Sequence, residues 1–444
     1  MNSQIFHYSV RPSIVRADEQ STVVIHPLGE NSAFMQGQVY KVVVREVETA
    51  HGDFQKFVGI TYECSPNEDG DIVITHTFRG EQKHTLTITR PECDLRSPHH
   101  AINHRAKYGE NISAVLGVYS LRPDLYGLRC YKGETHSHTY ESDGIMDVCH
   151  TVGNYRSAGY DFLAITDHYI SMSSEKAMRV FDPAPVDMTL LLGEEVHVPH
   201  EHIHAVHFGG RESVNAYFRE HADEVRAEVA QLEQTLSLPE NVPATDYAWR
   251  VWIARKAREL GGLAVIAHPH WIWENVFFMG DSTTEQLLRD GVYDALELQE
   301  ADTELAAAMW SELRAQGLHI PLVGSTDAHR SDPYEVNAPV RGCYTLVFAP
   351  DRSGDSIMSA IRAERSVCVD NKRTPAFIHG PYRLVKYARF LLDHYFPVYM
   401  RECRGQGPVL SEYPAEGEAP EALQTLLATL NHRSEKVAHD FFGY

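Results

Sequence analysis

The chain has 444 residues, with 61 Asp or Glu against 40 Lys or Arg, and its formal net charge is −21. This length predicts two or three domains of roughly 100–200 residues each. A composition of 43% hydrophobic and 23% charged residues excludes wholesale disorder. The acid excess argues against a protein that coats long nucleic acids, because phosphate backbones require clustered Lys and Arg. A small anionic substrate stays compatible with this charge, since a local metal cluster can override it.

The start of the chain and its cysteines indicate the compartment. The opening residues, MNSQIFHYSVRPSI, contain no cationic region followed by an apolar run. Nowhere does the chain contain about 18 consecutive apolar residues, the length that spans a membrane. We therefore expect a cytoplasmic protein with no membrane partner. The seven cysteines are odd in number, scattered and absent from any CxxC pair, so we expect reduced thiols that pack in the core, and neither disulfides nor a thiolate zinc site.

The first part of the chain has the pattern of a small all-β domain. From Ser21 to about Arg90, apolar and polar residues alternate in the runs TVVIHPL, VYKVVVREV, FVGITYEC, DIVITHTF and HTLTIT. A period of two predicts half-buried strands, and Asp69-Gly70 supplies the positive φ angles of a tight hairpin turn. We predict a β-sandwich-like domain over residues 1–125. Its role stays open between a binding or lid module and a packing or oligomerisation domain; we favour the latter, because no chemical cluster occurs there.

After a connection near Arg122 to Gly133, strands alternate with helices. Apolar runs that predict buried strands are FLAIT, MTLLL, HIHAVHF, LAVIA, YDALELQ, HIPLVGS and YTLVFA. Between them, residues 246–260 and 302–316 carry apolar side chains at helical spacing, and a Gly-Gly pair ends the first of these segments. Repeated β-α alternation predicts a parallel sheet, open or closed into a barrel, with its chemistry at the carboxyl ends of the strands.

Metal-ligand residues occur on or directly after these runs. In HSHTYESDG, His136 and His138 are two residues apart, so on a strand both can reach one ion, while the following loop can fold Asp143 back to a second. The second cluster is Asp167-His168, directly after the run FLAIT. There, Asp167 could orient a ligand through a hydrogen bond.

The third cluster is rich in histidine. It begins with GEEVH, which ends at His197, and four more histidines follow: His200, His202, His204 and His207. On a strand, the second and third of these would share one face and the last would lie on the other. We expect at most two of these five histidines to bind metal, the others being loop or core residues.

The last two clusters complete the pattern. In AHPH, proline follows His268 and fixes the backbone, so the imidazole can project from the end of the strand, with His270 close by. In STDAH, Asp327 and His329 form another pair two residues apart. Five clusters that each supply imidazole or carboxylate predict a metal centre. Because none supplies a thiolate, divalent Mn, Fe or Zn ions fit best.

In this order, the motifs resemble those of the PHP (polymerase and histidinol phosphatase) metallohydrolase family: HSHTYESDG, ITDH, GEE, the histidine-rich run, AHPH and STDAH. The resemblance covers roughly residues 131–370. It implies a distorted parallel (β/α)7 barrel over residues 131–374, with three metal ions at its carboxyl-terminal rim. Residues 375–444 lie outside it; helical stretches at 383–396 and around 420–438 are expected to pack on the barrel or on a partner subunit, which leaves a homo-oligomer open.

The resemblance also implies nine ligands for three ions. One ion would be held by His136, His138, Glu195 and Asp327, a second by Asp143, His168 and His329, and a third by bridging Glu195 with His204 and His268. Glu195 is preferred to Glu194 because the family pattern is Gly-x-Glu. His204 and His207 could exchange roles, because the family usually has glycine where this chain has His207.

Such a site predicts hydrolysis of an anionic substrate. We expect a metal-dependent phosphatase or phosphodiesterase that cleaves a small phosphoester with a metal-activated hydroxide and no covalent intermediate. Asp327 and Glu195 would be catalytic as ligands, with His270 as a candidate proton donor and Arg330 as a candidate substrate-binding residue. One alternative is a carboxyl or carbamate ester hydrolase, as in some carbaryl hydrolases that the family resembles. Another is a non-catalytic binding protein, and an amidohydrolase fits the order of motifs less well.

Overall fold

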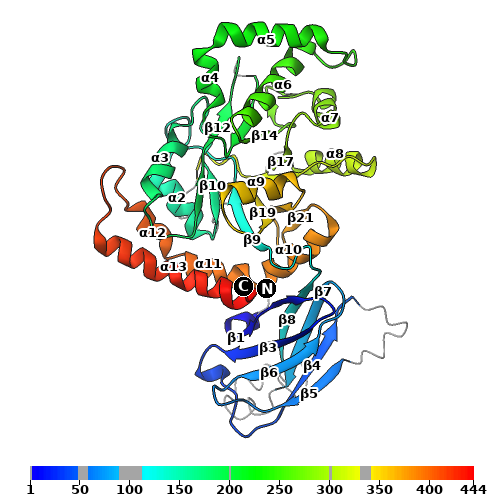
Figure 1. Ribbon diagram of the computed structural model, residues 1–444, viewed down its shortest axis with the longest axis vertical. Coiled ribbons are helices and arrows are strands. Elements are labelled where there is room, and N and C mark those ends of the chain that lie inside the picture. Colours follow the sequence, from blue (N-terminus) through cyan, green and yellow to red (C-terminus); the bar gives the residue numbers. More distant parts are fainter. Residues whose placement is uncertain (1–2, 49–58, 90–112, 200–201, 300–302, 331–341) are drawn as a thin grey trace. The chain divides into compact units, whose positions relative to one another are not determined.

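The chain forms two compact units in a computed structural model (Figure 1). The structure describes residues 3–48, 59–89, 113–199, 202–299, 303–330 and 342–444. The first unit contains Met1–Gly127, Arg389–Tyr399 and Arg433–Tyr444, and the second contains Leu128–Ala388 and Met400–His432. The predicted C-terminal extension, residues 375–444, is therefore divided between the two units.

The first unit contains two sheets. One has the strand order β2-β8-β7-β4-β5 and the other has the order β1-β3-β6. All neighbouring pairs are antiparallel except β2 with β8. The strands are β1 (Tyr8–Arg11), β2 (Ile14–Arg16), β3 (Gln20–Pro27), β4 (Tyr40–Glu46), β5 (Ile60–Cys64), β6 (Ile72–Thr77), β7 (Gln82–Thr89) and β8 (Ser113–Leu121).

Sequence alternation sets the core of this unit. In β7, Leu86 and Ile88 are fully buried, whereas the alternate residues Thr85 and Thr87 are partly exposed. These apolar side chains pack in one cluster with residues of β3, β4, β6 and β8. Removing apolar area from water stabilises the sheets by about 25 cal/mol per Å².

The predicted Asp69-Gly70 turn is present, but it joins strands of different sheets. Gly70 has a φ of 81°, and the side-chain oxygen of Asn67 accepts hydrogen bonds from the backbone N–H groups of Asp69 and Asp71, at 3.1 and 2.8 Å. Strand β5 before the turn pairs with β4, and β6 after it pairs with β3. The hairpin prediction was therefore wrong, because alternation reports which face is buried and not which strand pairs.

The second unit has two larger sheets and a short β15–β16 hairpin. The strand orders of the two larger sheets are β11-β10-β9-β19-β20-β21 and β12-β13-β14-β17-β18. The strands are β9 (Arg129–Glu134), β10 (Phe162–Ala164), β11 (Thr189–Leu191), β12 (Gly193–Val196), β13 (Ala205–Phe208), β14 (Leu263–Ile266), β15 (Ile272–Trp273), β16 (Val276–Phe277), β17 (Ala295–Gln299), β18 (Leu322–Ser325), β19 (Cys343–Ala349), β20 (Ser366–Asp370) and β21 (Phe377–His379).

Only part of this strand pairing is parallel. Strands β9, β10 and β11 run parallel, as do β14, β17 and β18. In contrast, β12, β13 and β14 are antiparallel neighbours, as are β9, β19, β20 and β21. The unit is thus a mixed α/β structure with a curled sheet, and the prediction of an all-parallel sheet was wrong for these pairs. The described residues between β12 and β13, 197–199 and 202–204, contain no helix, and a connection of this length can join only antiparallel strands.

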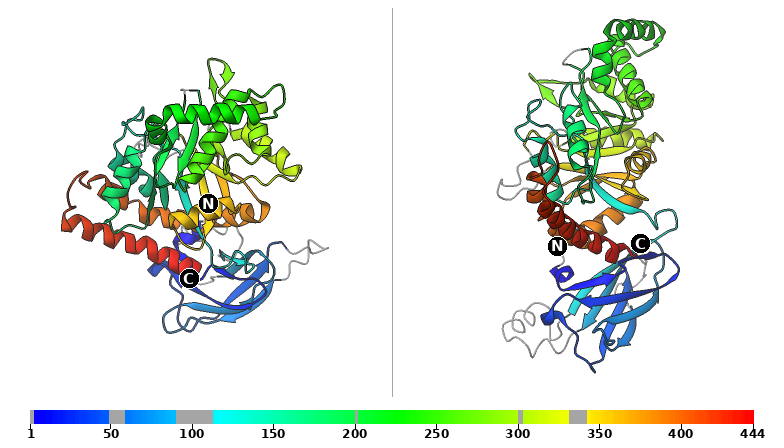
Figure 2. Two further views of the ribbon diagram at one scale, coloured as in Figure 1. Left: turned by 45° about the horizontal axis from the view of Figure 1, so that its top comes forward. Right: turned by 60° about the vertical axis from the view of Figure 1, so that its left-hand side comes forward.

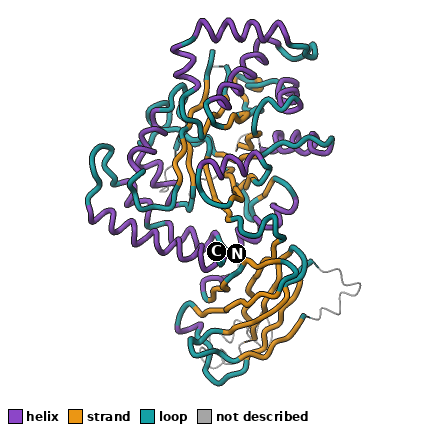
Figure 3. The backbone as a smooth tube through the Cα atoms, viewed as in Figure 1, coloured by secondary structure: helices purple, strands orange, loops and turns teal. Residues whose placement is uncertain are grey.

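Helices lie outside the strands of the second unit (Figure 3). Helix α6 packs on β14 and along α5 (Figure 2), α8 packs on β17, and α9 packs on β19. Among the described helices, none is long and apolar enough to cross a membrane. The described α-helices are α2 (Val148–Ser157), α3 (Met172–Phe181), α4 (Val214–Glu220), α5 (Ala222–Thr235), α6 (Ala244–Glu259), α7 (Asp281–Arg289), α8 (Thr303–Ala315), α9 (Gly354–Arg362), α10 (Tyr382–His394), α11 (Phe396–Cys403), α12 (Gln406–Ser411) and α13 (Glu421–Phe442).

Strand β9 carries a buried cation, Lys132. Its ammonium donates a hydrogen bond of 2.9 Å to the carbonyl of Ala158 and lies 4.0 and 4.4 Å from the ring centroids of Tyr160 and Tyr344. Burial lowers the pKa of Lys132 from 10.5 to about 7, although nearby Asp161 opposes the shift.

We expect the substitution Lys132→Met to weaken the pH dependence of folding. The unfolded lysine keeps its proton up to a pH near 10.5, whereas the folded one loses it near 7. Between these values the unfolded state binds more protons, so the stability of the wild type rises with pH. Methionine removes this contribution. Urea unfolding at a pH of about 7 and about 9.5 measures it, with the exposed Lys41→Met as control. An unchanged pH dependence in Lys132→Met would contradict the burial effect.

Candidate metal centre

The structure brings the nine predicted metal ligands together in three overlapping groups. Within each group the ligand atoms lie within 4.8 Å of one another. The groups are His136, His138, Glu195 and Asp327; His138, Asp143, His168 and His329; and Glu195, His204 and His268. Because His138 and Glu195 each belong to two groups, the three groups form one continuous cluster.

The first group is buried beside the end of β9. The Nε2 atom of His136 lies 3.3 Å from Glu195 Oε2 and 3.2 Å from Asp327 Oδ1. The Nε2 atom of His138 lies 2.8 Å from the same oxygen of Asp327. Two imidazoles thus face two carboxylates, which is a donor set that divalent ions accept.

Backbone register places these two motifs opposite each other. Asp327 N donates to His136 O, and His138 N donates to Ala328 O, both at 2.9 Å. The pairing joins the chain after β9 to the chain after β18, so HxH and DxH meet in space. Both Asp327 and His268 have positive φ angles, 49° and 22°, which non-glycine residues adopt at a cost and which occur frequently at functional sites.

Glu195, in β12, is the centre of the cluster. Its Oε1 lies 2.7 Å from His204 Nδ1 and 3.2 Å from His268 Nε2. Its Oε2 lies 2.8 Å from His168 Nδ1 and faces His136. One fully buried carboxylate therefore contacts imidazoles from four separate segments, as a bridging ligand would.

The second group forms the open side of the cluster. Asp143 Oδ2 lies 3.3 Å from His168 Nε2 and 3.1 Å from His329 Nε2. The side chain of Asp143 is 52% exposed and that of His329 is 39% exposed. A substrate in solvent can therefore reach this side, whereas the Glu195 side is closed.

Of the two histidines left open by the sequence, His204 joins the cluster. His207 is instead hydrogen-bonded through Nδ1 to Glu194 at 2.9 Å. Glu194 also accepts hydrogen bonds from the hydroxyl of Ser213 and the backbone N–H of Val214, at the start of α4. The two adjacent glutamates thus have different surroundings: Glu195 faces imidazoles, and Glu194 anchors a helix.

The predicted strand position of His202 and His204 was wrong. Strand β13 begins only at Ala205, so both histidines precede it. The alternation in HIHAVHF is typical of a strand, but its first residues belong to the connection from β12. His204 reaches Glu195 from that connection.

Glu297 and Gln299 support the ligands and were missed in the sequence. Glu297 Oε1 lies 2.9 Å from His136 Nδ1, and Glu297 Oε2 accepts from His268 N at 2.7 Å. The side-chain amide of Gln299 donates to Asp327 Oδ2 at 2.7 Å. Such contacts fix the orientation and tautomer of metal ligands. The available signal was a pair of polar residues, two positions apart, within the apolar run YDALELQ.

Asp167 was predicted to orient a ligand, and it holds the loop that follows His138. It accepts hydrogen bonds from Thr139 N at 2.7 Å, Thr139 Oγ1 at 2.6 Å and Ser142 Oγ at 2.6 Å. These contacts fix the loop just before Asp143. Asp167 therefore acts on the cluster through the backbone that carries two ligands.

His197 is a further candidate that the resemblance did not include. Its Nε2 lies 2.7 Å from His168 Nδ1, and with His168 and Glu195 it forms another group of ligand atoms within 4.8 Å. His197 is buried, so it can support His168 or act as a ligand itself.

His270 and Arg330 lie outside the ligand groups found among the described residues. His270 Nε2 is 3.2 Å from Asp281 Oδ1, and Arg330 is exposed. His270 lines a cavity of about 550 Å³ next to the cluster. Trp271 connects the cavity with the cluster: it lines the cavity, and its ring centroid lies 5.6 Å from that of the metal ligand His268. The other described lining residues are Ile272, Phe277, Thr303, Glu304, Leu305, Asp370, Lys372 and Arg373.

The carboxylates of the cluster are ionised despite their burial. Burial acts to raise the pKa of Asp327 and Glu195, but neighbouring imidazoles outweigh it, His136 foremost for Asp327 and His204 for Glu195, and hold both pKa values below the ordinary range. In contrast, burial raises the pKa of Glu134 to about 8. Glu134 holds backbone N–H groups and is not among the ligand groups.

The residues fit divalent metal ions. His136 Nε2 is buried without a hydrogen bond of good geometry to any described residue, although it faces two carboxylates. Buried polar atoms normally have a partner, and a cation between these groups would supply one. All donors are nitrogen or oxygen, which agrees with the predicted Mn, Fe or Zn.

Comparisons with known proteins concern part of the chain. Neither a family model nor a curated protein sequence matches it. Among solved structures, it is similar to a two-domain protein from Bacteroides vulgatus that contains a predicted PHP-like metal-dependent phosphoesterase. The identity is 18%, the TM-score is 0.40, and the match covers 56% of this chain and 67% of that one.

Two further structures are similar to the chain. One, from Bifidobacterium adolescentis, is proposed to be a metal-dependent phosphoesterase: identity 17%, TM-score 0.33, coverage 45% of this chain and 89% of that one. The other is an amidohydrolase from Chromobacterium violaceum: identity 19%, TM-score 0.30, coverage 44% and 87%. The first of these structures is described as PHP-like, which is the family that the sequence motifs resemble. The activities in these descriptions are those of the proteins described.

We expect Glu297→Gln to weaken metal binding. The change removes the negative charge that orients His136, so affinity for Mn²⁺ should fall about 10- to 100-fold, as is usual when a partner of a metal ligand is replaced. Competition with a chelator measures the affinity. Glu285→Gln, on the surface of α7, is the matched control and should bind like the wild type. Equal affinity in Glu297→Gln would show that this contact does not support the centre.

Proposed function

We propose that the chain is a metal-dependent hydrolase, most specifically a phosphatase or phosphodiesterase for a small phosphoester. The observation that carries the proposal is the convergence of three ligand groups on Glu195 and His138. The comparisons with PHP-like phosphoesterases agree with it but do not carry it. The proposal includes three ions, a distorted barrel formed by the two sheets of the second unit as the frame, and a cytoplasmic location.

Each ligand group would hold one divalent ion, with Glu195 shared. Such ions lower the pKa of a water molecule and neutralise charge on phosphate oxygens. The residues of the chain position them: Asp327 and Glu195 stay anionic, and Glu297 orients His136. The exposed Asp143 side admits the substrate.

The cluster favours direct hydrolysis over a covalent intermediate. The hydroxyl groups of Thr139 and Ser142, near the ligands, are both hydrogen-bonded to Asp167. They are thus held as donors to a carboxylate. The Ser142 hydroxyl lies 2.6 Å from Asp167 Oδ1 but 3.5 Å from His138 Nδ1, so the carboxylate and not the imidazole takes its hydrogen bond, and it is poorly placed to be activated as a nucleophile. The proposed nucleophile is therefore water.

Hydrolysis of a carboxyl or carbamate ester is the second candidate. It is favoured by the cavity next to the cluster, whose lining includes Trp271, Ile272 and Phe277. An apolar leaving group can bind there. Since a polarised water can attack carbon or phosphorus, substrate tests must separate the two reactions.

We expect Asp327→Asn to lose both metal and turnover. Asn keeps the shape of the side chain but removes the charge that His136 and His138 face. Initial rates of the manganese-loaded protein on nitrophenyl phosphate, bis-nitrophenyl phosphate and nitrophenyl acetate should show turnover of a phosphate substrate. That turnover should fall more than about 100-fold in the variant, beyond the effect of replacing a supporting residue.

The control for this experiment is Asp223→Asn, a fully exposed position on α5, which should keep wild-type rates and metal content. Turnover of acetate alone, lost in Asp327→Asn, would replace the phosphoesterase with the esterase. Full activity of Asp327→Asn on any substrate would contradict the metal assignment.

We expect His270→Ala and Arg330→Ala to separate proton donation from positioning. A proton donor matters more for a poor leaving group, so its loss should slow hydrolysis of phenyl phosphate more than that of nitrophenyl phosphate. We expect this difference for His270, which lines the adjacent cavity. For Arg330, a substrate-binding role predicts equal losses with a raised KM. Equal losses in His270→Ala would leave that residue only a positioning role.

A further inference from the structure

His197 contacts the metal centre without belonging to the nine predicted ligands. Its Nε2 lies 2.7 Å from His168 Nδ1, with the geometry of a hydrogen bond, and 3.7 Å from Glu195 Oε2. The three side chains could either share a further ion or be joined by a hydrogen bond within the protein. The ring nitrogens of His168 decide between these two arrangements.

The two ring nitrogens of His168 face different groups. Nε2 lies 3.3 Å from Asp143, in the ligand group at the open side, whereas Nδ1 faces His197 and Glu195. A neutral imidazole has one hydrogen, and when one ring nitrogen binds a metal ion the other nitrogen carries that hydrogen. With the proposed ion at Nε2, the Nδ1 of His168 is therefore a donor that needs an acceptor. A further ion at Nδ1 would require this last ring proton to leave as well.

His197 is the acceptor that the ions leave available. Glu195 Oε2 also lies 2.8 Å from His168 Nδ1, but Glu195 is the shared ligand of the proposed centre, so the ions compete for its oxygens. With Nε2 of His197 as acceptor, the hydrogen of His197 lies on Nδ1. That nitrogen is buried without a hydrogen bond to a described residue, so no described group imposes the opposite tautomer.

Packing fixes the ring of His197 independently of a metal ion. Its centroid is 4.1 Å from that of the His204 ring and 4.3 Å from that of Tyr169. Its backbone N–H donates to the side-chain oxygen of Asn215, in α4, at 3.2 Å, and the amide of Asn215 donates to Glu195 O at 3.1 Å. Ring and backbone are therefore both held, which an orienting residue requires.

We infer that His197 is a positioning residue for the metal ion at the open side of the cluster. It accepts the hydrogen of His168 Nδ1 and thereby directs Nε2 to the ion that Asp143 and His329 also bind. Those two side chains are 52% and 39% exposed, so the less exposed His168 fixes this ion from the protein side. The inference rests on the proposed metal-dependent hydrolysis and deepens it, because the ion that faces the substrate depends on a residue that does not bind it.

Metal binding by the full chain tests this role. Dialysis against a series of free Mn²⁺ concentrations gives the number of bound ions and the affinity of each. In His197→Ala we expect one ion to bind about 10- to 100-fold more weakly, the usual effect of losing the partner of a metal ligand, and the others to bind as in the wild type. His197→Gln should restore the affinity, since its side-chain oxygen can accept from His168. Unchanged affinity in His197→Ala would overturn the inference.

A double variant distinguishes the hydrogen bond from a further ion. Asp143→Ala and His197→Ala should weaken the same ion, so the double variant should lose one ion and not two. If His168, Glu195 and His197 held an ion of their own, the double variant would lose two. That result, or loss of an ion in His197→Gln, would contradict a positioning role.

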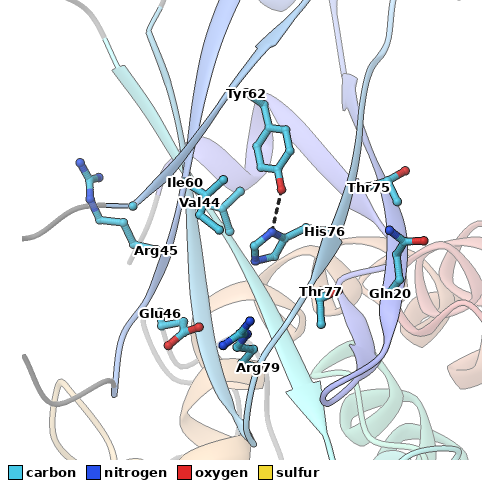
Figure 4. A pocket seen from close by; sticks show the side chains of 11 residues that line it. Gln20, Val44, Arg45, Glu46, Ile60, Tyr62, Thr75, His76, Thr77 and Arg79 are labelled. Atoms are coloured by element: carbon cyan, nitrogen blue, oxygen red, sulfur yellow. Dashed lines mark hydrogen bonds between the residues drawn. The ribbon is translucent and has the colours of Figure 1, made fainter.

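His76 provides the control for the loss of a buried imidazole. It belongs to the first unit, which contains none of the nine ligands, and it is 7% exposed against 5% for His197. Its Nδ1 lies 2.8 Å from the hydroxyl of Tyr62 (Figure 4). His76→Ala should bind Mn²⁺ like the wild type, and an equal loss in both variants would show that destabilisation, not orientation, releases the ion. A wild type that binds no Mn²⁺ would instead refute the proposed function, and the inference with it.

Discussion

The buried carboxylate of Glu195 is the constraint on which the rest of the metal centre depends. Taking such a charge out of water costs several kcal/mol unless partners compensate it. The compensation comes from four histidines. His136 follows β9, His168 follows β10, His204 precedes β13 and His268 follows β14. Because these strands belong to both sheets of the second unit, the carboxylate is satisfied only when the two sheets come together. Formation of the site therefore requires the packing of both sheets against each other.

Four acidic residues near the centre show how neighbours decide the role of one chemical group. Glu195 faces imidazoles and can bind metal. Glu194, the next residue, meets the first N–H groups of α4, where the helix dipole favours a negative charge. Glu297 faces a ring nitrogen that points away from the cluster, and Asp167 accepts from a backbone N–H and two hydroxyls. Only the first is placed as a ligand, and the others fix the position of ligands.

The sequence predicted the residues that the structure brings together better than it predicted the framework. HxH and DxH could be recognised because a strand puts residues i and i+2 on one side, and the resemblance supplied their grouping. Glu297 was hidden because an acid inside an apolar run resembles strand composition, and its partner His136 is distant in sequence. The antiparallel pairs, and the pairing of the strands on either side of the Asp69-Gly70 turn, were mispredicted for a related reason: side-chain periodicity describes faces, whereas pairing depends on contacts between distant segments. His204 and His207 could be separated only by their partners, Glu195 and Glu194.

In this protein the net charge affects the binding of long polyanions, whereas local charge affects the binding of small anions. The net charge of −21 repels long polyanions, but at physiological ionic strength a charge acts over only about 8 Å. Within that distance, cations held by the cluster of the second unit would face a substrate from beside Asp143. An acidic protein can therefore attract a small anion, provided that the excess of positive charge is local and partly enclosed. The distribution of carboxylates, more than their number, decides which anions can bind.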